Sequence, residues 1–394
     1  MVFEHDFKCK IEDIFSSFEK DSMAAASLAQ VHRATIKGTN QEVAVKLQYP
    51  TLRSQYTKDM DFIQFLVKTG DKLLNLNGYN DINFSKIIGA FRESLEDELD
   101  FRFEMSNGEK SKKHFSDNKD IHIPDYYHDY CSKRVLTMEF IRGAKINDLE
   151  AIEGLCLDPK TTAKILSKAM AQMIFRHGHV HCDAHPGNLM IRPNPKKPSV
   201  AQLVILDHGF YRKYDNEFLT IYCRLWQSMI TRDYATMKEL SYKLGINEYY
   251  RFLPLMLLWQ SRGSRKLGYR MSPEEKKKMG EQFKKQAEKR NKGKTEAEKK
   301  RAALNDINKF MQHLPEHLMF IIRASNLVGI HCLVLGGNQR ERLMTFTEVV
   351  YDQVYKGKPF WRGIMFMWFR FKLYFYENAF VVYSWFNKPK VHVY

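Results

Sequence analysis

The chain has 394 residues and carries 62 Lys and Arg against 46 Asp and Glu, a formal net charge of +16. Hydrophobic residues make up 44% of the sequence and aromatic residues 13%, which argues against a disordered chain. The length is too great for one ordinary core and fits a two-lobed domain with extensions. The positive charge predicts an anionic partner, such as a nucleotide, an anionic lipid surface or nucleic acid.

Cysteine usage and the N-terminus limit the cellular setting. Six cysteines are scattered without a C-x-x-C pair, so a disulfide framework is not expected. The first residues, Met-Val-Phe-Glu-His-Asp, have neither the apolar segment of a signal peptide nor the acid-poor composition of a transit peptide. This sequence therefore shows no targeting segment, although a longer precursor could carry one.

The N-terminal part predicts a strand-rich region that could bind a nucleotide. Residues 1–20 form an amphipathic lead-in, and Phe15–Phe18 enters the first strand. A run of small residues follows, and we expect it to form a loop that approaches a nucleotide closely. Its nucleotide-binding candidates are Ala24, Ala25, Ala26 and Ser27. Alanine lacks the conformational freedom of glycine, so this loop should be stiffer than a glycine-rich one.

The next two strands present a candidate phosphate-binding lysine. Strands are expected over 30–36 and 42–48, with a turn at Lys37–Asn40. The second contains Val43-Ala44-Val45-Lys46, a pattern that in kinases places the lysine against nucleotide phosphates. Exposed strands often end in lysine as well, so the motif gains its weight from the neighbouring small-residue loop.

Helices are expected over 52–75 and 82–110, and the second contains an acidic cluster. A buried lysine needs a partner, which Glu98, Glu104 or Asp100 could supply. Positions 98 and 104 do not share a helix face, so only one would pair with Lys46 in one state. A solvated acidic face is the alternative.

Two more strands, over 121–127 and 134–140, are expected before a break at Gly143. Glu139, in the second of them, is a further nucleotide-binding candidate. Beyond about residue 160 the sequence predicts mostly helix, interrupted by short strands around Met190 and Leu206.

The strongest motif is His181-Cys182-Asp183-Ala184-His185-Pro186-Gly187-Asn188, followed by Val204-Ile205-Leu206-Asp207. An Asp five residues before an Asn, with a second Asp after an apolar strand, is typical of a kinase-type site. We expect Asp183 to orient the acceptor or take its proton. Asn188 and Asp207 would hold Mg²⁺, which prefers hard oxygen ligands. His185 is expected near the phosphates.

The histidines of this motif also allow a zinc site. Its candidate ligands are His177, His179, His181, Cys182 and His185. Pro186 limits any helix here, and no second ligand pair follows at fixed spacing, which favours magnesium. We expect His181 to brace the loop from behind, and His208 to pack or hydrogen-bond beside Asp207.

Two later segments have unusual compositions. Residues 273–301 hold twelve Lys or Arg and six Glu, which indicates either a solvated insertion or an electrostatic clamp for anionic lipid or nucleic acid. Phe360–Phe386 is rich in aromatic residues with interleaved basic ones but has no stretch of about 18 uncharged apolar residues. It fits either an interfacial membrane helix or a helix docked on the core of its own domain.

Taken together, these motifs resemble the UbiB-like, aarF-domain-containing atypical kinases. The motifs that carry the resemblance are A-A-A-S-L-A-Q-V-H-R-A (24–34), V-A-V-K (43–46), E-L-D-F-R-F-E (98–104), H-C-D-A-H-P-G-N (181–188) and L-D-H-G (206–209). The resemblance covers about residues 5–350. It implies an α+β, protein-kinase-like fold with a strand-rich lobe (1–140), a mostly helical lobe (141–350) and a C-terminal helix (351–394).

The resemblance also implies a function. It implies Mg-ATP binding, ATPase or small-molecule kinase activity, a mitochondrial setting near a membrane, and a role in lipid or coenzyme Q homeostasis. Lys46 matches the nucleotide lysine, Asp183 the catalytic Asp, and Asn188 and Asp207 the metal ligands. Family members carry a K-x-G-Q motif before the alanine-rich loop; residues 1–22 lack it, so we expect a shortened chain or an uncapped site.

Three interpretations remain open from the sequence. The first is an active kinase or ATPase whose partners are ATP, anionic membrane lipids or a lipid-linked small molecule, and other proteins. The second is a pseudokinase that binds nucleotide and acts as a regulatory scaffold. The third, nucleic-acid binding, has no recognisable motif behind it, and we do not expect nucleic acid as a partner.

Overall fold

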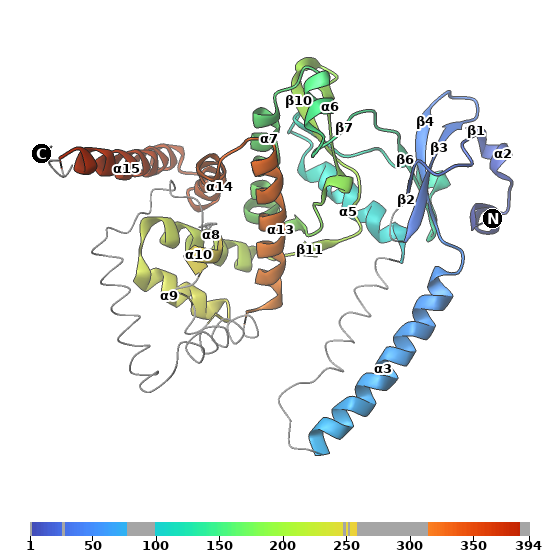
Figure 1. Cartoon of the computed structure of the whole chain (residues 1–394), viewed down its shortest axis with the longest axis horizontal. Helices are drawn as coiled ribbons and strands as arrows, with labels where there is room; N and C mark the ends of the chain where they lie inside the picture. The colour runs from blue at the N-terminus through green and yellow to red at the C-terminus, as the bar shows by residue number, and fades with distance from the viewer. Residues whose placement is uncertain are drawn as a thin grey trace, which may run out of the picture. The chain divides into compact units, whose positions relative to one another are not determined.

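The computed structural model describes residues 2–25, 28–76, 99–246, 250, 253–257 and 314–386 (Figure 1). Their contacts group into two compact units. The first comprises Met1–Asp158 and His185–Tyr211, and the second Pro159–Ala184 and Arg212–Tyr394. The division into 1–140, 141–350 and 351–394 stays a prediction, and the basic segment 273–301 lies outside the described residues.

The first unit contains an antiparallel sheet with the strand order β1-β3-β4-β6, to which β2 adds beside β3. Its strands are β1 (Phe15–Phe18), β2 (Ala24–Ala25), β3 (Ala29–Ile36), β4 (Glu42–Gln48) and β6 (Val135–Glu139). The predicted hairpin is confirmed, because β3 and β4 pair along their length. In its turn, Gly38 and Asn40 adopt positive φ angles of 82° and 53°, a conformation that glycine and asparagine tolerate best.

One face of this sheet forms an apolar core with the N-terminal helices. Phe3 is fully buried there together with Val43 and Val45 of β4. Because side chains alternate along a strand, Ala44 and Lys46 lie on the opposite face, where they are buried as well. The predicted lead-in is thus folded into this core, through α1 (Val2–Phe7) and α2 (Ile11–Ile14).

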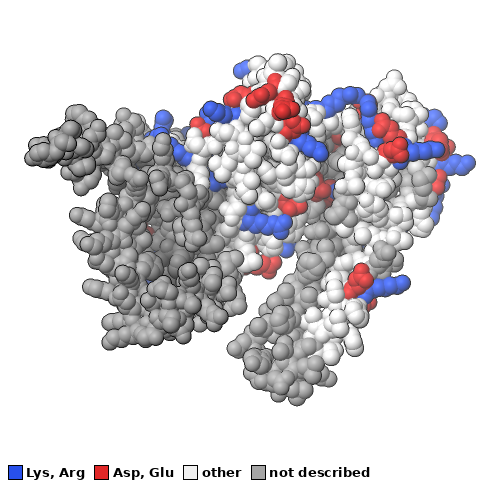
Figure 2. Space-filling model, in the orientation of Figure 1, with Lys and Arg blue, Asp and Glu red and all other residues white. Residues whose placement is uncertain are grey.

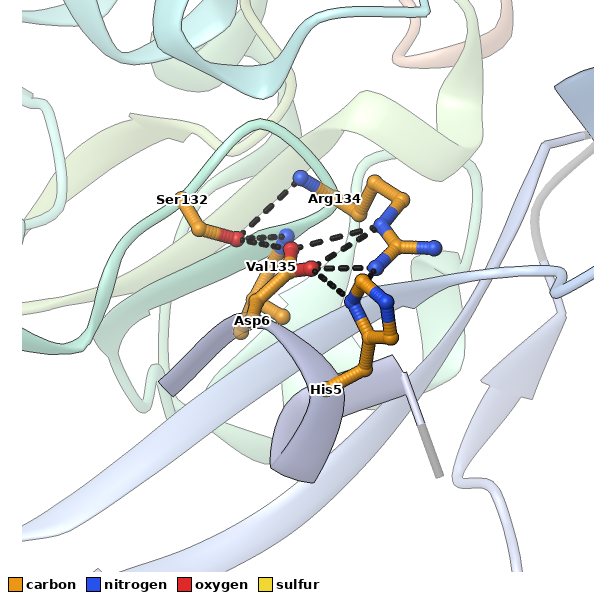
Figure 3. A network of polar contacts seen from close by, with 5 residues as sticks. All are labelled: His5, Asp6, Ser132, Arg134 and Val135. Carbon is orange, nitrogen blue, oxygen red and sulfur yellow. Dashed lines mark hydrogen bonds and ion pairs between the residues drawn. The ribbon is translucent and has the colours of Figure 1, made fainter. Parts of the chain in front are cut away.

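A polar network fastens α1 to the start of β6 (Figure 3). The Asp6 carboxylate accepts hydrogen bonds from the Arg134 guanidinium and, at 2.7 Å, from the Ser132 hydroxyl. The Ser132 oxygen also accepts from the backbone N–H of Val135, and His5 contacts the Arg134 guanidinium. Partial burial alone would raise the pKa of Asp6, but the hydrogen bonds from Arg134 and Ser132 outweigh it and lower the pKa.

This network makes a pH-dependent contribution to stability. We expect Asp6→Asn to lower the free energy of unfolding by about 1–2 kcal/mol at pH 7. A carboxyl with a lowered folded pKa stabilises the fold above its unfolded pKa and loses that contribution as the pH falls through the folded pKa. The two stabilities should therefore begin to converge below about pH 3.9, the usual pKa of an unfolded Asp, and should meet once the pH has fallen through the lower folded pKa. Urea unfolding between pH 3 and 7 measures this, and the exposed Asp117→Asn is the control.

A second sheet of the first unit has the strand order β5-β10-β9-β7. Its strands are β5 (Ile121–His122), β7 (Ala144–Lys145), β9 (Leu189–Asn194) and β10 (Lys197–Ile205). The expected strands around 190 and 206 are confirmed as an antiparallel hairpin, of which the second strand ends at Ile205. A strand over 121–127 is wrong in its length, because β5 ends at His122, two residues before Pro124, which cannot donate to a ladder.

The helices of this unit include α3 (Leu52–Leu76), α5 (Phe101–His114) and α6 (Leu149–Gly154). The first confirms the predicted helix over 52–75. A continuous helix over 82–110 is wrong: Asp100 is extended and caps α5 by accepting from the Arg102 N–H, and the Phe101 N–H bonds to the Lys133 carbonyl. Residues 82–98 lie outside the described part of the chain.

The second unit is mainly helical, as predicted for the region beyond residue 160. Its helices include α7 (Pro159–Ala171), α8 (Asn216–Thr231), α9 (Tyr234–Lys243), α10 (Leu253–Leu257), α13 (Glu316–Val334), α14 (Gln339–Val354) and α15 (Pro359–Phe386). A π-helical turn, Gln172–His177, follows α7. Its Phe175 stacks against Tyr222 of α8 and meets Phe346 of α14 edge-on, which places an aromatic core between these elements. One small sheet was not predicted: β8 (His179–His181) pairs with β11 (Tyr211–Lys213).

Candidate functional site

Lys46 forms the centre of a buried ionic cluster in the first unit. Its Nζ donates to both Glu104 oxygens, at 3.0 and 2.9 Å, and to Asp207 Oδ2 at 2.8 Å. The lysine is 7% exposed and Glu104 is 4% exposed. The face of β4 opposite the valine core thus meets the first turn of α5 and the loop after β10.

The cluster contains two carboxylates and one ammonium group, which shifts the pKa values of its members. Burial alone would lower the pKa of Lys46, but the charges of Glu104 and Asp207 raise it above its usual range. Burial and the nearby Asp207 charge raise the pKa of Glu104 to about 7, against the pull of Lys46. One ammonium is shared by two carboxylates, so the cluster carries an excess negative charge when both are ionised. A cation bound at Asp207 would relieve it.

Of the three acidic candidates, the structure pairs Glu104 with Lys46. Asp100 instead accepts from the Arg102 guanidinium at 2.7 and 2.9 Å and lies 3.7 Å from the Lys133 Nζ. Glu98 lies outside the described residues. The cap at Asp100 starts α5, so that Glu104 lies four residues further on, one helical turn away.

The two expected metal ligands lie together at one end of the β9–β10 hairpin. Asn188 immediately precedes β9 and Asp207 follows β10 by two residues. Leu189 and Ile205 are paired, and the Leu206 N–H donates to the Asn188 carbonyl at 2.9 Å. Asp207 Oδ1 also accepts from the Gly209 N–H at 2.8 Å. An amide oxygen and a carboxylate in this arrangement are donors that suit Mg²⁺.

The turn before Asn188 is held by His185. Its Nδ1 accepts from the Gly187 N–H at 3.0 Å and its carbonyl accepts from the Asn188 N–H at 3.0 Å. A Cβ at Gly187 would lie 2.7 Å from the imidazole ring, so glycine permits this approach. The imidazole is exposed and braces the turn that positions Asn188.

His208 anchors the loop that carries Asp207. It is fully buried, and its ring nitrogens contact the Tyr211 hydroxyl at 2.8 Å and the Ile205 carbonyl at 3.1 Å. Asn107 of α5 donates to the His208 carbonyl at 3.1 Å, which joins the helix of Glu104 to the loop of Asp207. Sequence patterns did not indicate Asn107, although its position three residues after Glu104 places it on the same helix face.

The start of the alanine-rich segment forms a strand, where the sequence predicted a loop. Ala24 and Ala25 form the short strand β2, exposed and paired with Val31 and Gln30, rather than an open loop. Small side chains allow this extended pairing against β3. Ala26 and Ser27 lie outside the described residues.

The Glu139 carboxylate is engaged within the protein. It contacts His122 Nε2 at 2.6 Å and accepts from the Arg192 guanidinium at 3.2 Å. Burial alone would raise the pKa of Glu139, but His122 and Arg192 lower it. Its side chain therefore ties β6 to β5 and β9.

Asp183 belongs to the second unit, directly after β8. Its N–H donates to Nδ1 of the buried His181 at 3.1 Å, the bracing contact expected of that histidine. Its Oδ1 accepts from the Arg323 guanidinium at 3.0 Å. Sequence reasoning missed Arg323, because 140 residues and the basic segment separate it from the motif and no spacing rule connects the two.

Comparison with known proteins places the chain among kinase-like sequences. The profile of the ABC1 atypical kinase-like domain matches residues 1–241. The probable serine/threonine-protein kinase abkD of Dictyostelium discoideum is 36% identical over 336 residues, 85% of this chain and 45% of that protein. AarF domain-containing protein kinase 1 of Mus musculus is 32% identical over 327 residues, 83% of this chain and 58% of that protein. The chain spans about half the length of the curated relatives it matches.

A solved structure shares the fold. The complex of Rv3197 with erythromycin from Mycobacterium tuberculosis gives a TM-score of 0.58 over 85% of this chain and 78% of that chain, at 21% identity. The likeness confirms the predicted α+β, kinase-like architecture.

Proposed function

Because the chain belongs to the ABC1 atypical kinase-like family, we propose that it is a Mg-ATP-dependent kinase or ATPase. Lys46 would contact the nucleotide phosphates, with Glu104 orienting it. Asn188 and Asp207 would hold Mg²⁺, which when bound would neutralise charge on the phosphates. Asp183 would accept the proton of the acceptor hydroxyl, or of water, as that oxygen bonds to the γ-phosphorus and ADP leaves.

The observation that carries the proposal is the Lys46 cluster. Burying a lysine with two carboxylates, where one would suffice to pair it, has no evident structural benefit. Perturbed buried charges of this kind are typical of functional sites. The hairpin adds Asn188 beside Asp207, so the proposed phosphate-binding cation and the two proposed metal ligands come from one unit.

The acceptor and the cellular role are inferred from family resemblance. We infer a role in mitochondrial lipid or coenzyme Q homeostasis, with a lipid-linked small molecule or water as the acceptor. The alternative is a pseudokinase that binds nucleotide as a regulatory scaffold. The polar residues that a kinase needs are all in the sequence, and this favours the enzyme.

Nucleotide and metal dependence provide the direct test. We expect Mg-ATP at 100 times its dissociation constant to stabilise the protein by about 2.7 kcal/mol. EDTA should remove most of this effect, because Asn188 and Asp207 would bind nucleotide only through the metal. Thermal unfolding with and without Mg²⁺ measures binding, and release of ADP measures turnover. Binding without turnover would support the scaffold, and the absence of both would refute the proposal.

A membrane partner is supported by the exposed face of α15. Phe366 and Phe369 pack on Tyr351 of α14, with ring centroids 6.2 and 6.3 Å from it. The helix therefore docks on its own unit by one face. Over residues 359–372, where the side chains of α15 are described, four other aromatic residues are exposed: Phe360 (72%), Trp361 (53%), Trp368 (52%) and Phe371 (54%).

Basic residues accompany these aromatic ones. Arg370 is exposed, and the Lys372 ammonium lies 5.2 Å from the Trp368 ring centroid. Tryptophan with interleaved Arg and Lys suits the interface of an anionic bilayer. On the face shown in Figure 2, by contrast, acidic and basic side chains of the described residues are interspersed.

One helix among the described residues, α13, is long and apolar enough to cross a membrane, but half of its most apolar window is buried inside the fold. The core helix of a water-soluble protein can be equally long and apolar, so α13 is weak evidence for a membrane-spanning segment. We infer that contact with a bilayer is made at its surface, through α15.

This inference predicts a loss of vesicle binding. In the full chain, Trp361→Ser with Trp368→Ser should weaken flotation with cardiolipin-containing vesicles by roughly tenfold or more, because two large apolar side chains no longer leave water. The matched control is Tyr234→Ser with Tyr242→Ser, which removes exposed aromatic residues from α9. Equal flotation of both variants would contradict the role of α15.

A further inference from the structure

Arg323 contacts Asp183 although the two residues of the second unit are 140 positions apart in the sequence. It lies on α13, and its guanidinium donates to Asp183 Oδ1 at 3.0 Å. The Asp183 side chain is 35% exposed and that of Arg323 is 55% exposed. An ion pair this exposed adds little to stability, about 0–1 kcal/mol. We therefore consider how the ion pair affects the orientation of the Asp183 carboxylate.

The same helix also contacts the backbone next to Asp183. His331 of α13 is buried, and its Nε2 lies 3.0 Å from the Ala184 carbonyl oxygen. The backbone of this segment is thus fixed at Ala184, and the Asp183 N–H is bound by His181. The Asp183 side chain could still rotate on this backbone, and its contact with Arg323 restricts that rotation.

Two basic residues near Asp183 also make contacts with other groups. Arg212 stacks on Phe320 of α13, 4.5 Å from its ring centroid, and lies 3.6 Å from Glu316. His185 follows Asp183 by two residues, where kinases often have a lysine, but its Nδ1 accepts from the Gly187 N–H. The Arg323 guanidinium, by comparison, donates directly to the Asp183 carboxylate.

We propose that Arg323 is a positioning residue for phosphoryl transfer, acting through Asp183. It would hold the carboxylate in the rotamer that meets the acceptor and supply the positive charge that a lysine supplies in other kinases. This proposal rests on the proposed function, because it assigns Arg323 no role without turnover. Misplacing a catalytic group by about 1 Å can lower a rate 100-fold, so a restrained carboxylate matters.

The test is a double-mutant cycle on Mg-ATP turnover by the full chain. Arg323→Gln should lower kcat by roughly 10- to 100-fold, with the KM for ATP changed by less than about threefold. Arg323→Lys should recover part of the loss, because it keeps the charge but not the planar donor geometry. Arg224→Gln, an exposed arginine of α8, is the control.

The combination with Asp183→Asn separates positioning from a structural role. If Arg323 acts through Asp183, the double variant is no slower than Asp183→Asn alone. Multiplying losses, or a wild-type kcat in Arg323→Gln, would overturn the proposal while the proposed function stands. A wild-type protein without turnover would overturn both. Thermal unfolding shows whether any variant has lost its fold.

Discussion

Replacing Asp183 by Asn should lower ATP turnover by about 10²- to 10⁴-fold, the range that a general base contributes. Asparagine has the same shape but cannot accept the acceptor's proton. Binding of Mg-ATP should change little, because Lys46, Asn188 and Asp207 are the proposed contacts of the phosphates and the metal. Titration with a fluorescent ATP analogue measures binding, and ADP release measures turnover.

The fold should survive this substitution. The Arg323 guanidinium that Asp183 contacts is more than half exposed, so water can solvate it when its partner is neutral. Asp129→Asn, on an exposed turn of the other unit, is the matched control and should leave turnover unchanged. Full turnover in Asp183→Asn would remove Asp183 from the chemistry and direct attention to another base.

The second large effect is expected at Lys46. Lys46→Met leaves the carboxylates of Glu104 and Asp207 without the ammonium that both contact. Breaking a buried ion pair by removing one partner costs about 3–5 kcal/mol. We therefore expect a loss of this size in the free energy of unfolding, together with a loss of nucleotide affinity. Urea unfolding and nucleotide titration measure the two effects.

A second substitution tests whether unpaired carboxylates cause the loss of stability in Lys46→Met. Glu104→Gln added to Lys46→Met removes one of the two unpaired charges and should restore part of the stability, so the two losses do not add. Nucleotide affinity should stay low, because the proposed phosphate contact is still missing. Lys145→Met, at an exposed strand position, is the control. Additive losses would show that Lys46 and Glu104 contribute independently.

Short-range patterns predicted much of this architecture. The β3–β4 hairpin follows from alternating residues around a Lys-Gly-Thr-Asn turn, and the helix over 52–76 follows from its length and spacing. The kinase-like fold followed from the order of the motifs. The hairpin and the helix depend on residues close in sequence, whereas the fold depends on a family resemblance carried by motifs between residues 24 and 209.

The errors arose where a capping or tertiary contact overrode local preference. The helix expected over 82–110 instead begins anew at Phe101, because Asp100 caps it and the Phe101 N–H bonds to Lys133. Spacing alone could not choose between Glu104 and Asp100 as the partner of Lys46. Arg323 and Asn107 were missed altogether, because their contacts join segments 140 and 101 residues apart.

The β9–β10 hairpin has a consequence for how this site could be lost. Asn188 and Asp207 are spaced by strand register, since the pairing of Leu189 with Ile205 sets their alignment. A one-residue deletion within β9 would slip that register by about 3.3 Å and reverse the faces of its side chains. Both proposed ligands would remain in the sequence, yet they could no longer reach the same metal ion. Insertions and deletions along this hairpin are therefore as informative for telling active from inactive relatives as substitutions of the ligands themselves.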